Sequence, residues 1–325
     1  MMLKSGDLSQ EMEKDPPNPR VISKYLGGFT MKKLLLTVFL VLSFVCVFSF
    51  SIVDDLGRVV EIESTPQRVV IAAPVFTNYL VRLGISDRIV GVTDYDMFDA
   101  EKIGQLTPLN IEKIVSLKPD IVIVSGGFQA AETYKLEKFN LKTVCFNQNN
   151  LDAIFRTMNI LSAIFGVEET GQRLSAEANE KMLSISRDKA YKIPLENRKT
   201  VFYSMISGSE VKDLWTCGQG SFLNEVISLA GGVNITGNYS GANGWLPISV
   251  EFVASKNPDV ILVPYYYEGG EKSTEQVIKS FSPWKQITAV KEGNIYGIDG
   301  NKAAYANFDL IELMEEIYEK LYGDN

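Results

Sequence analysis

The sequence contains one helix-to-strand junction twice: "EKIVSLKPDIVIV" spans Glu112–Val124, and "EFVASKNPDVILV" spans Glu251–Val263. Both stretches follow the pattern Glu-x3-Ser-x2-Pro-Asp, and four aliphatic residues come directly after the aspartate. The first part has the spacing of a helix, the proline ends that helix, and the aliphatic run is typical of a buried strand. The repeat predicts two similar α/β lobes, each containing this junction.

Strands and helices alternate around both junctions. In the first half, "RVVIAAP" (68–74), "RIVGVT" (88–93) and "LKTVCFN" (141–147) are predicted strands. In the second half, "KTVFYSMI" (199–206) is a predicted strand and "GSFLNEVISLAGG" (220–232) a predicted helix. This alternation is typical of parallel sheets covered by helices on both faces.

A polar segment separates the two halves. Residues 167–191 have helical spacing, but only a narrow apolar stripe at Leu174, Ala178, Met182 and Ile185. Such a helix is too polar to be buried within one domain, and we expect it to bridge two lobes. The predicted fold class is therefore α/β, with two parallel-sheet lobes joined by one long helix and a ligand cleft between the lobes.

Both ends of the predicted mature chain also have clear patterns. "SIVDDLGRVVEI" (51–62) predicts a hairpin with Gly57 in its turn. "FDLIELMEEIYEKLYG" (308–323) has apolar residues at helical spacing, so we expect the chain to end on an amphipathic helix of the second lobe.

The N-terminus contains a targeting segment. A basic start, "MKK" at Met31, precedes seventeen uncharged residues, which is typical of a secretory signal peptide. We expect residues 1–30 to be a mis-assigned upstream extension, residues 31–51 to be the signal peptide cleaved before Ile52, and the mature protein to be periplasmic. Because "SFVC", ending at Cys46, lacks the pattern of a lipoprotein signal, we expect no lipid anchor. An uncleaved anchor helix is the alternative.

Composition excludes several classes of function. The net charge of −8 and the lack of a dense basic patch beyond the N-terminus argue against a nucleic-acid partner. The chain contains no histidine, which excludes a Ser-His-Asp hydrolase and a His-ligated zinc site. Signatures of other enzymes are sparse, because no Walker sequence occurs and Cys217 has no histidine to activate it as a nucleophile. Cys145 and Cys217 fall in different predicted lobes, and we expect both to be free thiols.

Aromatic and polar residues gather where the predicted strands end. In a parallel α/β lobe this edge lines the ligand crevice, although aromatic side chains there also cap the ends of a sheet. Trp215 and Trp245, in Gly-rich "DLWTCGQG" and "GANGWLP", are the strongest candidates. The predicted ligand-binding residues are Phe76, Asn78, Tyr95, Trp215, Trp245, Tyr265, Lys302 and Tyr305.

Each copy of the junction begins with a glutamate placed two residues after a predicted N-cap. Glu112 follows Asn110, and Glu251 follows Ser249. A carboxylate in the first turn is favourable by about 0.3–1 kcal/mol through the helix dipole, which is one explanation for both residues. Their recurrence at one position in two lobes also suits a pair of docking points for a partner.

The ordered motifs together resemble the periplasmic substrate-binding proteins of ABC importers for iron-siderophores, haem and vitamin B12. The resemblance covers about residues 52–322. It implies the class III fold, with Rossmann-like lobes at 52–166 and 194–325 joined by a linking helix at 167–193. The motifs are "DDLGRVV", "PQRVVIAAP", "GVTDYD", "NIEKIVSLKPDIVIV", "GSFLNEVISLAGG", "ISVEFVASKNPDVILV" and "VKEGNIYGID".

The resemblance also implies roles for individual residues. Glu112 and Glu251 match the glutamates that meet arginines of the permease. Tyr95, Trp215 and Trp245 match aromatic positions of the vitamin B12 pocket.

Two positions depart from that pocket. Leu106 stands where its members have a tryptophan, and Tyr305 where they have an arginine. Lys212 and Lys302 are the only basic candidates in the expected cleft loops, which favours a neutral, partly apolar ligand.

These observations predict a non-catalytic, monomeric binding protein that captures a metal chelate. A ferric siderophore or similar iron complex is the first expectation, a corrinoid is the alternative, and haem remains open. The partners implied are an ABC permease and its ATPase, with no cofactor beyond the metal within the chelate. Alternatives of another class are an exported ligand sensor and a chelate-processing enzyme.

Overall fold

The computed structural model describes residues 50–205 and 211–323 of the chain. The predicted extension at residues 1–30 lies outside these ranges, as does the predicted signal peptide at 31–51 apart from its last two residues. In the described part of the chain, no helix is both long and apolar enough to cross a membrane. The compact unit that is described begins at Phe50.

The N-terminal lobe is built on a five-stranded parallel sheet with the order β5-β4-β3-β6-β7. Before this sheet, β1 and β2 pair as the predicted antiparallel hairpin, with Gly57 at a positive φ of 74° in the turn. The strands are β1 (Phe50–Val53), β2 (Val59–Ile62), β3 (Val69–Ile71), β4 (Ile89–Val92), β5 (Glu101–Lys102), β6 (Ile121–Ser125) and β7 (Thr143–Phe146).

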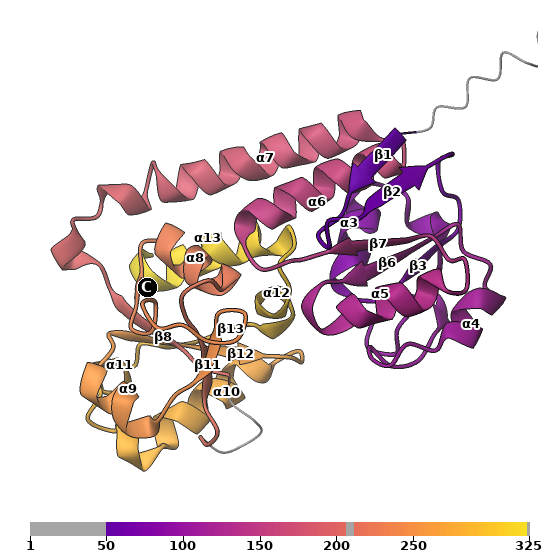
Figure 1. Cartoon of the computed structure of the whole chain (residues 1–325). Coiled ribbons are helices and arrows are strands. Elements are labelled where there is room, and N and C mark those ends of the chain that lie inside the picture. The colour runs from indigo at the N-terminus through magenta and orange to yellow at the C-terminus, as the bar shows by residue number, and fades with distance from the viewer. Residues whose placement is uncertain (1–49, 206–210, 324–325) are drawn as a thin grey trace, which may run out of the picture. The chain divides into compact units, whose positions relative to one another are not determined.

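Helices cover both faces of this sheet (Figure 1). Because side chains alternate along a strand, Ile121 and Ile123 pack in the cluster that includes α3 and α6, whereas Val122 and Val124 pack in the cluster that includes α4 and α5. The α-helices of this lobe are α3 (Val75–Arg82), α4 (Ile111–Ser116), α5 (Ala130–Glu137) and α6 (Leu151–Ile164).

The C-terminal lobe repeats this architecture with a four-stranded parallel sheet of order β10-β8-β12-β13. A separate antiparallel ribbon pairs β9 with β11. The strands are β8 (Thr200–Tyr203), β9 (Trp215–Cys217), β10 (Val233–Asn234), β11 (Trp245–Pro247), β12 (Val260–Tyr265) and β13 (Ile295–Asp299). The α-helices are α8 (Phe222–Leu229), α9 (Val250–Lys256), α10 (Gly270–Ser280), α11 (Thr288–Glu292), α12 (Gly300–Ala304) and α13 (Asp309–Tyr322).

The two helix-to-strand junctions have the same local structure. The side chain of Asn110 caps α4 and that of Ser249 caps α9, each accepting a hydrogen bond from the backbone N–H three residues later. After each helix, one residue takes a left-handed conformation before the proline: Lys118 at φ 49° and Asn257 at φ 46°. This conformation ends the helix and turns the chain into the strand.

The aspartate of each junction ties its strand to the neighbouring strand. Asp120 exchanges backbone and side-chain hydrogen bonds with Arg68, just before β3, because its carboxylate accepts the Arg68 N–H at 2.9 Å and its own N–H donates to the Arg68 carbonyl. Asp259 makes the same pair of contacts with Thr200 at the start of β8, with a side-chain distance of 2.8 Å. The repeated Pro-Asp thus sets the register of the central strands in both lobes.

One long helix, α7 (Glu168–Ser186), connects the lobes. It packs along α6 of the first lobe and against α13 and α8 of the second (Figure 1). Only Gly171 and Ile185 are fully buried in it, in keeping with its narrow apolar stripe. The α-helix ends at Ser186, five residues before the predicted end at residue 191, and a short 3-10 turn follows at Ala190–Lys192.

The hydrophobic core continues from one lobe into the other. Phe308, which precedes α13, is 4% exposed and packs edge-to-face on Tyr79 of α3 and Phe155 of α6, with ring centroids 5.9 Å and 5.8 Å away. The Tyr79 hydroxyl also lies 3.2 Å from the Ala306 carbonyl oxygen. Buried aromatic pairs of this kind add about 0.5–1.5 kcal/mol each beyond the burial of area. The lobes are therefore joined by packed side chains as well as by α7.

Cys145 lies in β7 and Cys217 in β9, and both are buried free thiols, as predicted. Burial raises the pKa of Cys145 to about 11 and that of Cys217 to about 12, so neither is a reactive thiolate near neutral pH.

Candidate functional site

The C-terminal lobe contains a cavity of about 400 Å³ whose wall is mainly aromatic. It is called the aromatic cavity below. Tyr203 contributes from the end of β8, Trp215 and Trp245 from the β9–β11 ribbon, and Tyr266 from the end of β12. The lining residues are Tyr203, Met205, Trp215, Trp245, Tyr266, Ala303 and Ala304.

The ribbon places its two tryptophans by strand pairing rather than by the predicted loops. Trp215 pairs with Pro247, and Trp245 pairs with Cys217. Trp245 is half-buried and packs edge-to-face on Tyr203 and Phe222, each with a centroid distance of 6.0 Å. Trp215 is 44% exposed, a large apolar surface that a bound molecule would cover.

Gly244 fits the tight turn that leads into β11. It has a φ of 80°, and a Cβ at this position would lie 2.2 Å from the Ser221 backbone nitrogen. No other residue type fits both the backbone conformation and the close approach. The glycines of "GANGWLP" therefore hold Trp245 against the N-terminus of α8.

A second cavity, of about 250 Å³, lies between the lobes and is called the interlobe cavity below. Ala304 lines both cavities, so the segment Ala303–Ala306 forms a wall common to them. The lining residues are Ala73, Pro74, Val75, Leu106, Ser125, Phe128 and Gln148 from the first lobe and Phe222, Ala304, Tyr305 and Ala306 from the second.

Neither cavity has a charged residue among its described lining residues. Burial raises the pKa of Tyr203, Tyr266 and Tyr305 above the usual tyrosine value, with smaller contributions from neighbouring phenols and, at Tyr305, from Asp96. These phenols are therefore neutral hydrogen-bond donors and acceptors near pH 7. The described lining residues offer aromatic surface and hydroxyl groups but no counter-charge for an ionic ligand.

Three of the predicted ligand-binding residues line these cavities: Trp215, Trp245 and Tyr305. Tyr95 follows β4, is 54% exposed and bonds through its hydroxyl to Gln105 at 2.6 Å, without lining either cavity. Tyr265 also lies outside both linings, whereas Tyr266 lines the aromatic cavity. Successive side chains along an extended segment point to opposite sides, which explains why Tyr266 and not Tyr265 lines the cavity.

Phe76 needs a correction, because the structure places it in the core. It has no exposed surface and packs against Tyr79 and Phe146. It lies in the first turn of α3, and the turn's neighbouring residues Pro74 and Val75 line the interlobe cavity instead.

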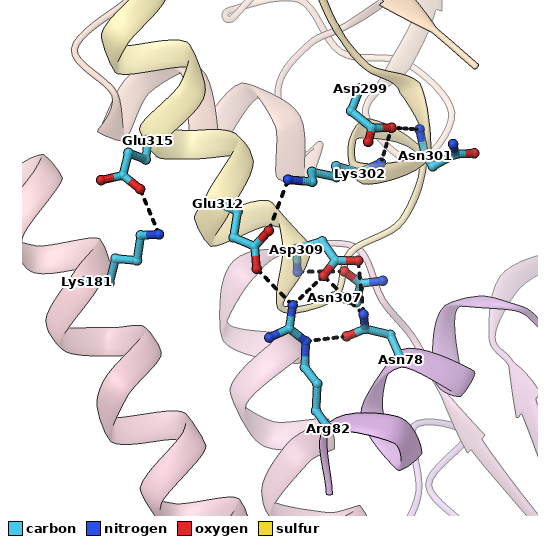
Figure 2. A network of polar contacts seen from close by, with 10 residues as sticks. All are labelled: Asn78, Arg82, Lys181, Asp299, Asn301, Lys302, Asn307, Asp309, Glu312 and Glu315. Atoms are coloured by element: carbon cyan, nitrogen blue, oxygen red, sulfur yellow. Dashed lines mark hydrogen bonds and ion pairs between the residues drawn. The ribbon is translucent and has the colours of Figure 1, made fainter. Parts of the chain in front are cut away.

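Asn78 and Lys302 lie in a polar network between α3 and α13, not in the lining of a cavity (Figure 2). Asn78 donates to the Asp309 carboxylate at 3.0 Å and 3.1 Å, and Lys302 pairs with Glu312 at 3.0 Å. Both residues already have partners in the protein. Lys212, the other basic candidate, lines a separate cavity with Phe281 and Pro283.

Sequence reasoning missed several cavity residues, chiefly Tyr203, Met205, Phe128 and Phe222. Tyr203 and Met205 come at the end of β8, so the strand-end rule that selected Tyr265 could have found them. Phe222 begins a helix and reaches the cleft only because α8 packs beneath Trp245, which no local pattern reveals.

Glu112 and Glu251 are exposed in the first turns of α4 and α9. Neither forms a hydrogen bond or an ion pair with any residue that the structure describes. The carboxylates are therefore available to a partner. Within the described ranges, no group of three or more Cys, Asp and Glu side chains is arranged to hold a metal ion.

Comparison with known proteins places this geometry in a family. The profile of the family described as "Periplasmic binding protein" matches residues 69–301. The chain is 26% identical over 287 residues to the uncharacterized ABC transporter substrate-binding lipoprotein YvrC of Bacillus subtilis, covering 86% of this chain and 87% of that protein. It is also 26% identical to a vitamin B12-binding protein of Vibrio cholerae, with 76% of this chain and 87% of that protein covered.

A solved structure shares the fold. The molybdate periplasmic binding protein MolA of Haemophilus influenzae, bound to molybdate, superposes with a TM-score of 0.72 at 22% identity, covering 84% of this chain and 91% of that one. The two-lobed α/β fold predicted from the sequence is confirmed.

The comparison with YvrC corrects the expected localisation. That relative is a lipoprotein, which contradicts our expectation that this chain has no lipid anchor. Cys46, which the expectation concerned, lies outside the described residues. A location outside the cytoplasm is consistent with all these relatives.

Proposed function

This chain belongs to the periplasmic binding protein family and is an ABC transporter substrate-binding protein, and we propose that it captures a neutral, largely apolar metal chelate for delivery to its permease. One observation carries the choice of ligand class. The aromatic and interlobe cavities meet at Ala304 and are lined by aromatic, aliphatic and uncharged polar groups.

An ionic ligand fits this site poorly. Moving a charged group out of water without an opposite charge costs several kcal/mol, and the described lining residues supply no such charge. Aromatic rings favour a ligand with a broad apolar surface, because each buried square ångström contributes about 25 cal/mol. The phenols of Tyr203, Tyr266 and Tyr305 would orient such a ligand through hydrogen bonds.

Two kinds of chelate satisfy these conditions: a neutral ferric hydroxamate and a corrinoid. The relationship to vitamin B12-binding proteins supports the corrinoid. The residues that depart from the expected B12 pocket, Leu106 and Tyr305, both line the interlobe cavity and support the iron complex instead. We therefore retain the ferric chelate as the first candidate and the corrinoid as the alternative.

Isothermal titration calorimetry with four probes tests the ligand class: ferrichrome, ferric enterobactin, haemin and dicyanocobinamide. We expect ferrichrome or dicyanocobinamide to bind one to one and to be recovered unchanged, and the anionic ferric enterobactin not to bind. Tight binding of ferric enterobactin without binding of either neutral probe would rule out the proposal. Chemical conversion of a bound probe would point to an enzyme.

Substitution of Trp215 tests the aromatic cavity. We expect Trp215→Ala to weaken binding of the probe that the wild type binds by about 1–3 kcal/mol, because a central aromatic contact is lost. Trp245→Ala should weaken it at least as much, with added loss of packing on Tyr203. Phe139→Ala is the matched control, since Phe139 is 56% exposed outside both cavities. Unchanged affinity in both tryptophan variants would remove these residues from the site.

We further propose that Glu112 and Glu251 dock the protein onto its permease. The double variant Glu112→Arg/Glu251→Arg should abolish stimulation of the reconstituted transporter's ATPase while ligand affinity stays unchanged, because the two glutamates are exposed and lie outside both cavity linings. Glu169→Arg/Glu180→Arg on α7 makes the same change of charge and should leave stimulation intact. Loss of ligand affinity in the first variant, or equal loss of stimulation in both, would contradict the docking role.

A lipid anchor, if present, has one available position. Of the three cysteines of the chain, Cys145 and Cys217 are buried, so we propose that Cys46 is the lipidated residue. Cleavage before Ile52 would also remove Phe50 and Ser51, which pair with Ile62 and Glu61 in the hairpin. This pairing supports processing upstream of β1.

Fatty-acid labelling of cells that produce the full chain tests the anchor. We expect the wild type to be labelled with an alkyne analogue of palmitate and found in the membrane fraction, and Cys46→Ser to be unlabelled and released. A soluble, unlabelled wild-type protein with Ile52 as its first residue would contradict the proposal.

A further inference from the structure

Asn78, Arg82, Lys302, Asp309 and Glu312 form one cluster between the lobes, called the clasp (Figure 2). We propose that the clasp fixes the wall Ala303–Ala306 that the two cavities share, and that Arg82 is its positioning residue. The inference rests on the proposed function only where it concerns ligand capture. It assigns a role to residues that touch neither cavity.

The wall comprises the last two residues of α12 and the first two of the loop that leads to α13, and these two helices are held together. Lys302 of α12 precedes it, and Glu312 of α13 follows it, and their side chains pair at 3.0 Å. The backbone before the wall is fixed as well, because the Asp299 carboxylate accepts the N–H groups of Asn301 and Lys302 at 2.9 Å and 3.4 Å. The loop between α12 and α13 is therefore closed by an ion pair across its base.

Arg82 links this closed loop to the other lobe. Its Nη2 lies 2.5 Å from Asp309 Oδ1 and 3.1 Å from Glu312 Oε1. Its Nε donates to Asn78 Oδ1 at 3.0 Å, and the Asn78 amide donates in turn to the Asp309 carboxylate. The Arg82 guanidinium thus contacts both carboxylates in the first turn of α13, and it also contacts the Asn78 side chain of its own helix, α3 (Figure 2).

The same helix, α3, also lines the cleft. Pro74 and Val75 at its start line the interlobe cavity together with Tyr305 and Ala306 of the other lobe. A shift of α3 relative to α13 therefore changes how the lining residues of the two lobes are placed relative to each other. The contacts of Arg82 restrain that shift at the far end of the helix.

The energies of these contacts suit positioning better than global stabilisation. The side chains are 29%, 26% and 43% exposed for Arg82, Asp309 and Glu312, and ion pairs this accessible to water add little to the free energy of unfolding. Burial opposes the charged form of Arg82, but hydrogen bonds and charges of Asp309 and Glu312 outweigh it and raise its pKa. Burial likewise opposes ionisation of Glu312, yet Lys302 and Arg82 lower its pKa.

Lys181 and Glu315 provide a matched contact that does not hold the wall. They pair at 2.7 Å between α7 and α13, one helical turn beyond Glu312, and are 40% and 44% exposed (Figure 2). Loss of Lys181, like loss of Arg82, removes one positive charge that pairs with a glutamate of α13. Of these two basic side chains, Arg82 comes from α3 and pairs with Asp309 and Glu312 in the first turn of α13, whereas Lys181 comes from α7.

Hydrogen exchange of the full chain, read by mass spectrometry without added ligand, tests the clasp. In Arg82→Gln we expect the amides of residues 303–308 to exchange at least about threefold faster, because local opening becomes easier. Lys181→Gln should leave that segment at the wild-type rate. Arg82→Lys, which keeps the charge but loses the fork of donors, should restore part of the protection.

Two results would overturn the inference: wild-type exchange at residues 303–308 in Arg82→Gln, or an increase spread equally over both lobes, which would indicate general destabilisation. A second arm measures ferrichrome and dicyanocobinamide binding, where we expect Arg82→Gln to weaken whichever probe binds by about three- to tenfold, mainly through faster dissociation. If the wild type binds no probe of the panel, the proposed function fails, while the exchange rates still decide the clasp.

Discussion

The packing of Phe308 between Tyr79 and Phe155 is the contact on which the cleft depends. It brings the segment before α13 into the first lobe, so that one continuous core runs beneath both sheets. Protein cores are close-packed and do not deform continuously, so lobes that share a core keep a defined separation. The cavity walls at Ala304 and Tyr305 are the immediate continuation of this anchored segment. The proposed ligand site therefore adjoins the part of the structure that holds the lobes together.

The anchored wall and the neutral lining together suggest how the protein selects its cargo. A largely preformed site gains affinity because little side-chain freedom is lost on binding. Charged residues near the cavities form ion pairs with one another: Arg82 pairs with Asp309 and Glu312, and Lys302 pairs with Glu312. Their positive charges are thus compensated before any ligand arrives. The cavities are left with aromatic surface and phenol groups, which suit a neutral chelate.

Much of the fold could be predicted because its signals are local. The Pro-Asp junctions, the N-caps at Asn110 and Ser249, and the narrow apolar stripe of α7 are each visible within one short segment of the sequence. The candidate site depends on contacts between residues that are distant in the sequence. Asn78 and Asp309 are 231 positions apart, and no local sequence pattern predicts their hydrogen bond. Trp215 was predicted from its Gly-rich segment and Tyr305 from the loop before the last helix. The strand-end rule selected Tyr265 instead of Tyr266, since a one-residue step reverses the direction of a side chain.

The central claim, that the cleft between two firmly joined lobes holds a neutral metal chelate, is tested most directly by native mass spectrometry. The protein would be isolated under gentle conditions from cells grown with a complex metal supply, and its bound mass and metal isotope pattern measured. We expect one neutral iron or cobalt complex per chain, with lower occupancy when Trp215 or Trp245 is replaced by alanine. A co-purified anionic ligand without metal, or unchanged occupancy in both variants, would contradict the claim.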